Sequence, residues 1–366
     1  MLLSKLSRSL CLVVAVLLVN VQASAASLED SLSRFVTENE FNGVILVARK
    51  GEVLHHRAYG HADFEAGTPT ALTTRYQLGS ISKYVASLVV LKLVDEKKLS
   101  LTRPISDYLP AYRKDVGAKV TLHHLLSHTS GVPSDIVAAY RANKDIAKVE
   151  LPVATAVERY ASGELLFEPG ARFDYSHSNW ILVRAIIESA SGRSYEENVQ
   201  RLLAPLKLKD TGIFSGDFST IPGGAMGYKA VKPEPQRSPE PLPTYMACAG
   251  GLYGTAADLL TLTRAIHDGK VVSKASLQKL TTPYVADEGY AYGGRVRTLK
   301  LGGRDEVIDW NTGSSGPYKS RVSHAPSSGL TVIFLSNTNM HPGKTGAATE
   351  EVLQLLAAEP RGKSKR

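Results

Sequence analysis

The chain has 366 residues, 43% of them hydrophobic, and a formal net charge of +8. This length and apolar content allow one large folded domain, or two interleaved ones, with a substantial core. No basic segment is interleaved with aromatic residues and no nucleic-acid-binding motif occurs, so the positive charge does not indicate a nucleic-acid partner.

Residues 1–25 have the pattern of a secretory signal peptide. Lys5 and Arg8 give a positive start, residues 10–21 are apolar, and residues 23–25 (ASA) form a small-residue cleavage site. The apolar run is short for a membrane span, so cleavage is favoured over anchoring and no transmembrane segment is expected afterwards. We expect a periplasmic or secreted bacterial protein, and its net positive charge would favour contact with an anionic cell envelope.

Only two cysteines occur, and Cys11 lies within the predicted signal peptide. Cys248 is then left alone between small residues, so no internal disulfide can form. We interpret Cys248 as a buried structural thiol rather than a nucleophile.

The elements after the signal peptide begin with an amphipathic helix over residues 28–39. Residues 43–60 alternate as two strands joined by a turn at Lys50 and Gly51. Residues 80–95 are apolar on nearly all sides, which predicts a buried helix.

A helix-rich region with several prolines follows, from about residue 101 to residue 220. The proline-dense segment 232–243 (KPEPQRSPEPLP) predicts an extended, exposed loop. Residues 255–269 return to helix, residues 294–302, 315–325 and 329–337 predict strands, and residues 345–358 predict a last helix. Strands at both ends predict an α+β fold: a mostly antiparallel sheet flanked by N- and C-terminal helices, with a helical lobe inserted at about residues 98–245.

The segment LGSISK, residues 78–83, places Ser80 at the start of the buried helix and Lys83 one turn later on the same face. A serine hydroxyl becomes a nucleophile when a neighbour takes its proton, and a partly desolvated lysine can do so. The simpler interpretation is a serine helix cap followed by a surface lysine. The same spacing recurs at Ser276 and Lys279, so the pair alone is weak evidence.

Four further segments favour the nucleophile. They are LTRPISDYLP (101–110), VTLHHLLSHTSGVP (120–133), residues 167–212, and AGGLYGTAADLLTLTRAI (249–266). With LGSISK they resemble the serine β-lactamase and penicillin-binding-protein superfamily, in the branch of class C β-lactamases, DD-peptidases and esterases. The resemblance runs in order from about residue 44 to residue 356. It implies a β-lactamase/transpeptidase-like hydrolase domain over residues 26–360, followed by a basic tail, residues 361–366.

This resemblance implies that Ser80 and Lys83 are the catalytic serine and lysine. The family's Tyr-x-Asn motif corresponds to residues 175–177, so Tyr175 is implied to assist proton transfer, as a phenolate or by a relay through the lysine. His177 stands where the family has asparagine, and it would contact the substrate differently. Asn179 is interpreted as structural.

The family's third motif, Lys-Thr-Gly or His-x-Gly, corresponds to residues 311–313 (NTG). A literal KTG at residues 344–346 follows the last strand and is rejected. Gly313 would let substrate lie along the strand, and the backbone N–H groups of Ser314 and Ser80 are implied to form the oxyanion hole.

Asn311 is neutral and cannot pair with a substrate carboxylate, which argues against efficient β-lactam hydrolysis. Four cations from neighbouring strands are alternatives: Arg295, Arg297, Lys319 and Arg321.

Three histidines, His123, His124 and His128, are close in sequence, but the carboxylate of a metalloprotease motif is missing. The resemblance implies a structural turn there, and neither a metal nor an organic cofactor is expected.

The sequence therefore predicts an exported serine hydrolase that forms an acyl-serine with a small-molecule or peptide substrate. A D-amino-acid peptide or β-lactam is the first expectation, as for a D-alanyl-D-alanine carboxypeptidase. The alternatives are a carboxylesterase of the same fold and a non-catalytic module that binds or senses penicillin or peptidoglycan.

Overall fold

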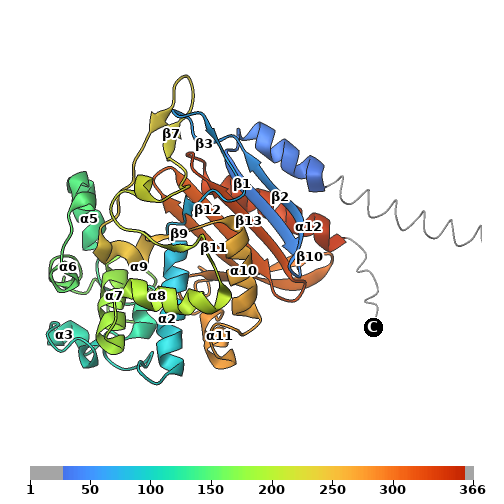
Figure 1. Ribbon diagram of the computed structural model, residues 1–366. Helices are drawn as coiled ribbons and strands as arrows, with labels where there is room; N and C mark the ends of the chain where they lie inside the picture. Colours follow the sequence, from blue (N-terminus) through green and yellow to red (C-terminus); the bar gives the residue numbers. More distant parts are fainter. Residues whose placement is uncertain (1–27, 359–366) are drawn as a thin grey trace, which may run out of the picture.

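The computed structural model describes residues 28–358, so the predicted signal peptide and basic tail lie outside the described residues. A six-stranded antiparallel sheet has the order β10-β11-β12-β13-β1-β2 (Figure 1). Its strands come from both ends of the chain, which confirms the predicted α+β architecture. They are β1 (Gly43–Arg49), β2 (Glu52–Tyr59), β10 (Arg295–Leu301), β11 (Arg304–Ser315), β12 (Tyr318–Ala325) and β13 (Leu330–Ser336).

Strand β1 lies between β13 and β2 and pairs with both. The turn from β1 to β2 uses Lys50 and Gly51 at φ values of 52° and 85°. Both values lie in the left-handed region, which permits the tight reversal that the sequence predicts.

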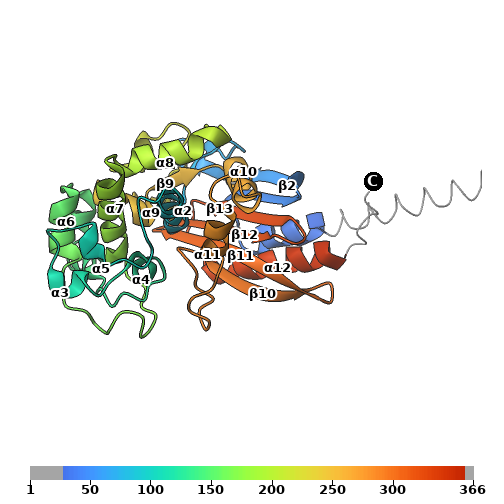
Figure 2. The same ribbon diagram turned by 90° about the horizontal axis from the view of Figure 1, so that it is seen from below.

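Helices cover both faces of the sheet. Ile45 and Val47 of β1 pack with the helix over residues 28–38 and with α12 (Pro342–Ala358). Val44 and Leu46 point the other way, into a core shared with α2 (Ile81–Asp95) and α10 (Ala256–His267). Figures 1 and 2 show α12 on one side of the sheet and α10 on the other.

Helix α2 is buried along nearly its whole length, as its uniformly apolar sequence predicts. It contacts α7, α8, α9 and α11 as well as β11, and so joins the sheet to the helical part. The remaining α-helices are α3 (Lys114–Gly117), α4 (Leu122–Leu126), α5 (Asp135–Ala142), α6 (Val153–Tyr160), α7 (Ser178–Ser191), α8 (Tyr195–Leu203), α9 (Ala247–Gly250) and α11 (Lys274–Leu280).

Short strands and 3-10 turns connect these elements. The strands are β3 (His61–Asp63), β4 (Thr68–Pro69), β5 (Tyr76–Gln77), β6 (Gly212–Ile213), β7 (Tyr228–Ala230), β8 (Gln236–Arg237) and β9 (Leu252–Gly254). The 3-10 turns are η1 (Ile105–Asp107), η2 (Lys144–Lys148), η3 (Ala204–Leu206), η4 (Phe218–Thr220) and η5 (Thr244–Met246). Among the described residues, no helix is both long and apolar enough to cross a bilayer.

The proline-dense segment 232–243 agrees with its prediction in part. Residues 232–237 are exposed and include the short strand β8, which pairs with β7. Residues 241–243 instead turn inward against the helical part. Proline composition predicts an extended backbone, but it does not determine whether that backbone docks on a neighbour.

The second serine–lysine pair, in α11, is accounted for by packing. Ser276 Oγ donates a hydrogen bond to Asp95 at 2.7 Å, while Lys279 is exposed as predicted. This pair has no hydroxyl facing its lysine, so it has no catalytic geometry.

Candidate active site

The turn before α2 is fixed by hydrogen bonds from two sides. Leu78 N–H donates to Leu252 O of β9 at 2.9 Å, and Ser320 Oγ of β12 donates to Leu78 O at 2.9 Å. Gly79 has φ of 51°, and a Cβ added there would lie 2.8 Å from Ser314 N. Only glycine fits this close, left-handed position, and it brings the start of α2 against β11.

Ser80 occupies the N-cap position of α2, but its side chain makes no capping hydrogen bond. Lys83 Nζ donates to Ser80 Oγ at 2.9 Å, and the Tyr175 hydroxyl donates to the same atom at 3.1 Å. The structure therefore brings the three residues together around one hydroxyl oxygen.

Lys83 is fully buried on the inner face of α2. Its Nζ also donates to Ala249 O of α9 at 2.7 Å and lies 5.3 Å from the centroid of the Tyr175 ring. These contacts hold the amine in one direction, toward Ser80 Oγ.

Tyr175 is supported by His128, whose ring stacks on it at 4.1 Å between centroids and an angle of 22°. Ser176 N–H donates to His128 Nδ1 at 3.0 Å. Burial, and next the charge of Lys83, hold the pKa of His128 well below its usual value. A neutral imidazole there supports the tyrosine without repelling the lysine.

The strand β11 runs past Ser80 at close range. A Cβ on Gly313 would lie 1.8 Å from Leu78 O, so glycine is required for this approach. Pairing between β10 and β11 ends at Arg295 and Trp310, so β10 does not cover the end of β11 that carries Ser314.

A cavity of about 230 Å³ opens at Ser80 and Ser314. Its lining is mostly apolar and comes from α5, η2, α9 and the segment 240–246, and it includes Ile136, Val137, Tyr140, Ile146, Pro241, Leu242, Pro243, Tyr245 and Met246. Glu240 contributes a carboxylate, and no lysine or arginine lines the cavity within the described residues. The sequence predicted none of these walls, because no motif marks them.

His177 lines the same cavity, with its ring 5.3 Å from the Tyr175 ring between centroids. Burial, followed by the charge of Lys83, lowers the pKa of His177 to about 3. Its imidazole is therefore neutral and can offer a hydrogen bond without a charge.

Asn311 is buried and lines a different, small cavity beside Tyr84 and Asp309. Of the four alternative cations, Lys319 reaches closest to the cavity, because its Nζ donates to Ser314 Oγ at 2.8 Å. The three arginines gather around Trp310 instead.

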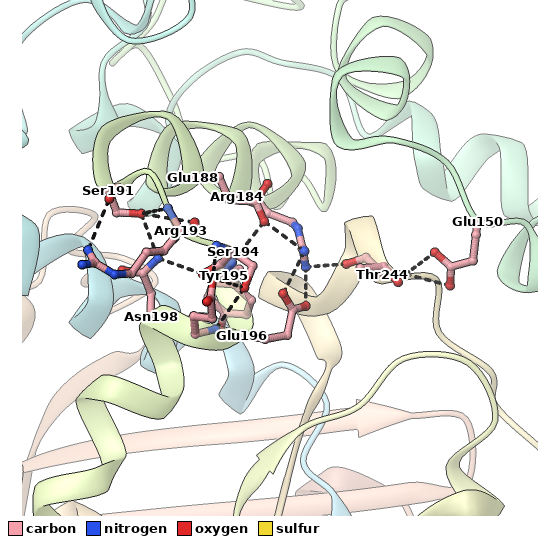
Figure 3. A network of polar contacts seen from close by, with 11 residues as sticks. Glu150, Arg184, Glu188, Ser191, Arg193, Ser194, Tyr195, Glu196, Asn198 and Thr244 are labelled. Atoms are coloured by element: carbon pink, nitrogen blue, oxygen red, sulfur yellow. Dashed lines mark hydrogen bonds and ion pairs between the residues drawn. The ribbon is translucent and has the colours of Figure 1, made fainter.

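The cavity wall at η5 is anchored by a polar network (Figure 3). Arg184 of α7 donates to Thr244 O at 2.7 Å and pairs with Glu196 at 2.8 Å and Glu188 at 3.0 Å. Thr244 N–H donates to both carboxylate oxygens of Glu150, at 2.9 and 3.0 Å. Main-chain atoms of the wall are thus held from two sides.

A family model described as Beta-lactamase matches residues 28–357. The chain belongs to the β-lactamase family. This β-lactamase-family protein is 31% identical over 278 residues to esterase EstB of Burkholderia gladioli, a match that covers 66% of this chain and 70% of the esterase. It is 26% identical to a teichoic acid D-alanine hydrolase of Staphylococcus aureus, over 70% of this chain and 61% of that protein.

A penicillin-binding protein from Bacillus halodurans has a similar structure, with a TM-score of 0.76 and 26% identity over 87% of this chain and 99% of that one. The β-lactamase-family protein is therefore a serine hydrolase of the β-lactamase/transpeptidase fold, which confirms the sequence prediction at that level.

In this β-lactamase-family protein, structural contacts account for the remaining residues that the sequence analysis singled out. His123 Nδ1 lies 2.7 Å from the Tyr292 hydroxyl, and His124 forms a capping box with Thr121. Asn179 is buried and accepts from Ser130 Oγ at 2.8 Å. Cys248 is buried, and burial raises the pKa of its thiol well above the usual value.

Proposed function

We propose that Ser80 is the nucleophile of an acyl-transfer hydrolase. Its Oγ attacks the substrate carbonyl, and its proton passes to the Lys83–Tyr175 pair, which then delivers it to the leaving oxygen or nitrogen. Water next attacks the acyl-serine, the carboxylic acid leaves, and Ser80 recovers its proton. The observation that carries this proposal is the pair of contacts at Ser80 Oγ, 2.9 Å to Lys83 and 3.1 Å to Tyr175.

The oxyanion of the tetrahedral intermediate would lie between the backbone N–H groups of Ser80 and Ser314. Ser80 is at the N-terminus of a 15-residue helix, where developing negative charge is stabilised by roughly 0.3–1 kcal/mol. The close packing at Gly79 and Gly313 supports this arrangement, because it keeps β11 beside the start of α2.

The substrate class that the cavity supports best is an ester of an uncharged, apolar carboxylic acid. The lining offers apolar surface and a neutral His177, and the motif position that would pair with a substrate carboxylate is the buried Asn311. These features favour the carboxylesterase alternative over β-lactam hydrolysis.

A D-aminoacyl ester or amide is the second candidate, because Glu240 also lines the cavity. Its carboxylate could pair with the free ammonium of such an acyl group. The similarity to a teichoic acid D-alanine hydrolase supports this candidate as well.

The test is kcat/KM on p-nitrophenyl butyrate, a D-alanyl ester, a D-Ala-D-Ala peptide and a chromogenic cephalosporin. We expect the butyrate ester to be the best substrate and the cephalosporin the poorest. A cephalosporin turned over faster than either ester would overturn the substrate assignment.

We also infer that the enzyme is exported to the periplasm or beyond, on the basis of the charged, apolar and small-residue pattern of residues 1–25. N-terminal sequencing of the protein from a cell-envelope or culture-medium fraction should begin near residue 26. An intact N-terminus on a cytoplasmic protein would contradict export.

A further inference from the structure

Three arginines surround one tryptophan on the sheet face that carries α12. The guanidinium carbons of Arg295, Arg297 and Arg321 lie 5.5, 5.6 and 5.0 Å from the centroid of the Trp310 ring. We call these four residues the arginine cluster. Arg295 lies directly opposite Trp310 in the sheet, and Arg321 lies opposite Thr312, so the cluster spans β10, β11 and β12.

The cluster has more positive than negative charge. Glu350 of α12 pairs with Arg297 at 2.8 Å, and Glu288 lies 3.4 Å from Arg295. Arg321 has neither an ion pair nor a hydrogen bond within residues 28–358, although it is only 7% exposed. Its Nε and Nη1 are buried without an acceptor, and so is Nε of Arg297.

Such an arrangement is unfavourable unless an anion completes it. A buried cation without a partner loses its hydration, and the contact with an indole ring replaces only part of that loss. Burial, with the charge of Arg297 second, lowers the pKa of Arg321 to about 10. A guanidinium presents its N–H donors in a planar fork, which matches the two oxygens of a carboxylate or phosphate.

We propose that the arginine cluster binds an oxyanion, a carboxylate or a phosphate group, held by Nε and Nη1 of Arg321. The side chains of Arg295 and Arg297 are 25% and 33% exposed, so the cluster is open to solvent on their side. The ring of Trp310 contacts all three guanidinium groups. Glu350 already pairs with Arg297, so its carboxylate would compete with the ligand for that side chain.

The ligand is a free anion rather than a carboxylate of the substrate bound at Ser80. Thr312, opposite Arg321, lies one residue from Gly313, and neighbouring residues of a strand point to opposite faces of a sheet. The cluster therefore lies on the face that carries α12, with the sheet between it and Ser80.

The first experiment is thermal unfolding in inorganic phosphate or acetate, compared with chloride at equal ionic strength. We expect both oxyanions to raise the midpoint of the wild type and of Arg304→Gln, which removes an exposed charge from the start of β11. Arg321→Met should lose this shift, and without oxyanions it should unfold at the same temperature as the wild type or higher. Equal shifts for wild type and Arg321→Met would overturn the proposal.

A second variant distinguishes anion binding from an effect of Arg321 on folding alone. Glu350→Gln removes the competing carboxylate and should lower the phosphate dissociation constant several-fold in isothermal titration. A purely structural role for Arg321 predicts no change in that constant, and an unchanged or weaker affinity would contradict the site.

Two esters that differ by a carboxylate, p-nitrophenyl butyrate and p-nitrophenyl hemisuccinate, test this placement. Arg321→Met should leave KM unchanged for both esters while it abolishes the phosphate-induced shift of the unfolding midpoint. A KM that rises for the hemisuccinate alone would contradict a site on the α12 face of the sheet. Equal phosphate shifts in wild type and Arg321→Met would overturn the site without bearing on Ser80.

Discussion

Ser80 Oγ is reached by two side chains from different elements, Lys83 from the same helix and Tyr175 from the loop before α7. Each partner is held by a contact that does not involve the substrate: Lys83 by Ala249 O, and Tyr175 by the stacked ring of His128. Such preorganisation keeps the Lys83 amine and the Tyr175 hydroxyl within hydrogen-bond distance of Ser80 before a substrate binds.

The change Lys83→Met should lower kcat by about 10²–10⁴-fold, the usual contribution of a positioned acid or base, with a small effect on KM. Steady-state kinetics on p-nitrophenyl butyrate measures both. The matched control is Lys279→Met, which alters the lysine of the other serine–lysine pair and should leave kcat unchanged. A Lys83→Met enzyme with wild-type kcat would remove Lys83 from the mechanism.

At this scale, Ser80, Lys83 and Tyr175 could be predicted from spacing combined with the family resemblance. The resemblance gave His128 only as part of a structural turn, and its stacking on Tyr175 appears only when the turn folds against the loop before α7. Glu240 gave no signal because it lies in a proline-dense segment without a motif. Sequence patterns report local chemistry, whereas contacts between distant loops depend on tertiary packing.

Among the elements, η5 forms part of the cavity wall, and α7 holds it through Arg184 (Figure 3). Arg184 is buried and joins η5 to Glu188 and Glu196. The position of the wall therefore depends on a charged residue that does not itself line the cavity.

We expect Arg184→Met to lower the free energy of unfolding by about 1–3 kcal/mol, as for the loss of a hydrogen bond to a charged group. It should raise KM for p-nitrophenyl butyrate more than it lowers kcat, because the wall loosens while Ser80 keeps its partners. Urea unfolding and steady-state kinetics check both effects, with the exposed Arg201→Met of α8 as control. An unchanged KM would show that the wall does not depend on Arg184.

Elements with a strong pattern, such as α2 and the hairpin of β1 and β2, could be predicted from the sequence. The docking of residues 241–243 could not, because an extended backbone gives no indication of whether it stays exposed or packs against a neighbouring element. Strands at both ends of the chain predicted a shared antiparallel sheet, but the pattern did not indicate which strands are neighbours, such as β1 and β13.

Across the whole molecule, several buried histidines are neutral. Burial first, and then His267, lower the pKa of His324 to about 4, and His177 falls to about 3. Their unfolded pKa is about 6.5, so between that value and the folded value the unfolded chain binds more protons. The stability that these neutral histidines allow is complete above pH 6.5 and is lost as the pH falls toward 4.

Denaturant unfolding between pH 7 and pH 4 should therefore show a free energy of unfolding that decreases as the pH falls. The slope of this free energy against pH reports the number of protons taken up on unfolding. His324→Asn should reduce that number by close to one, while the exposed His341→Asn should leave it unchanged. A slope that is the same in wild type and His324→Asn would mean that His324 is not held neutral in the folded protein.

The central claim, an acyl-type adduct on Ser80, is tested most directly by labelling with a fluorophosphonate, followed by peptide mass spectrometry. We predict one adduct per chain, located on Ser80, and no labelling of folded Ser80→Ala. An adduct on a different residue, or labelling that persists in Ser80→Ala, would contradict the account.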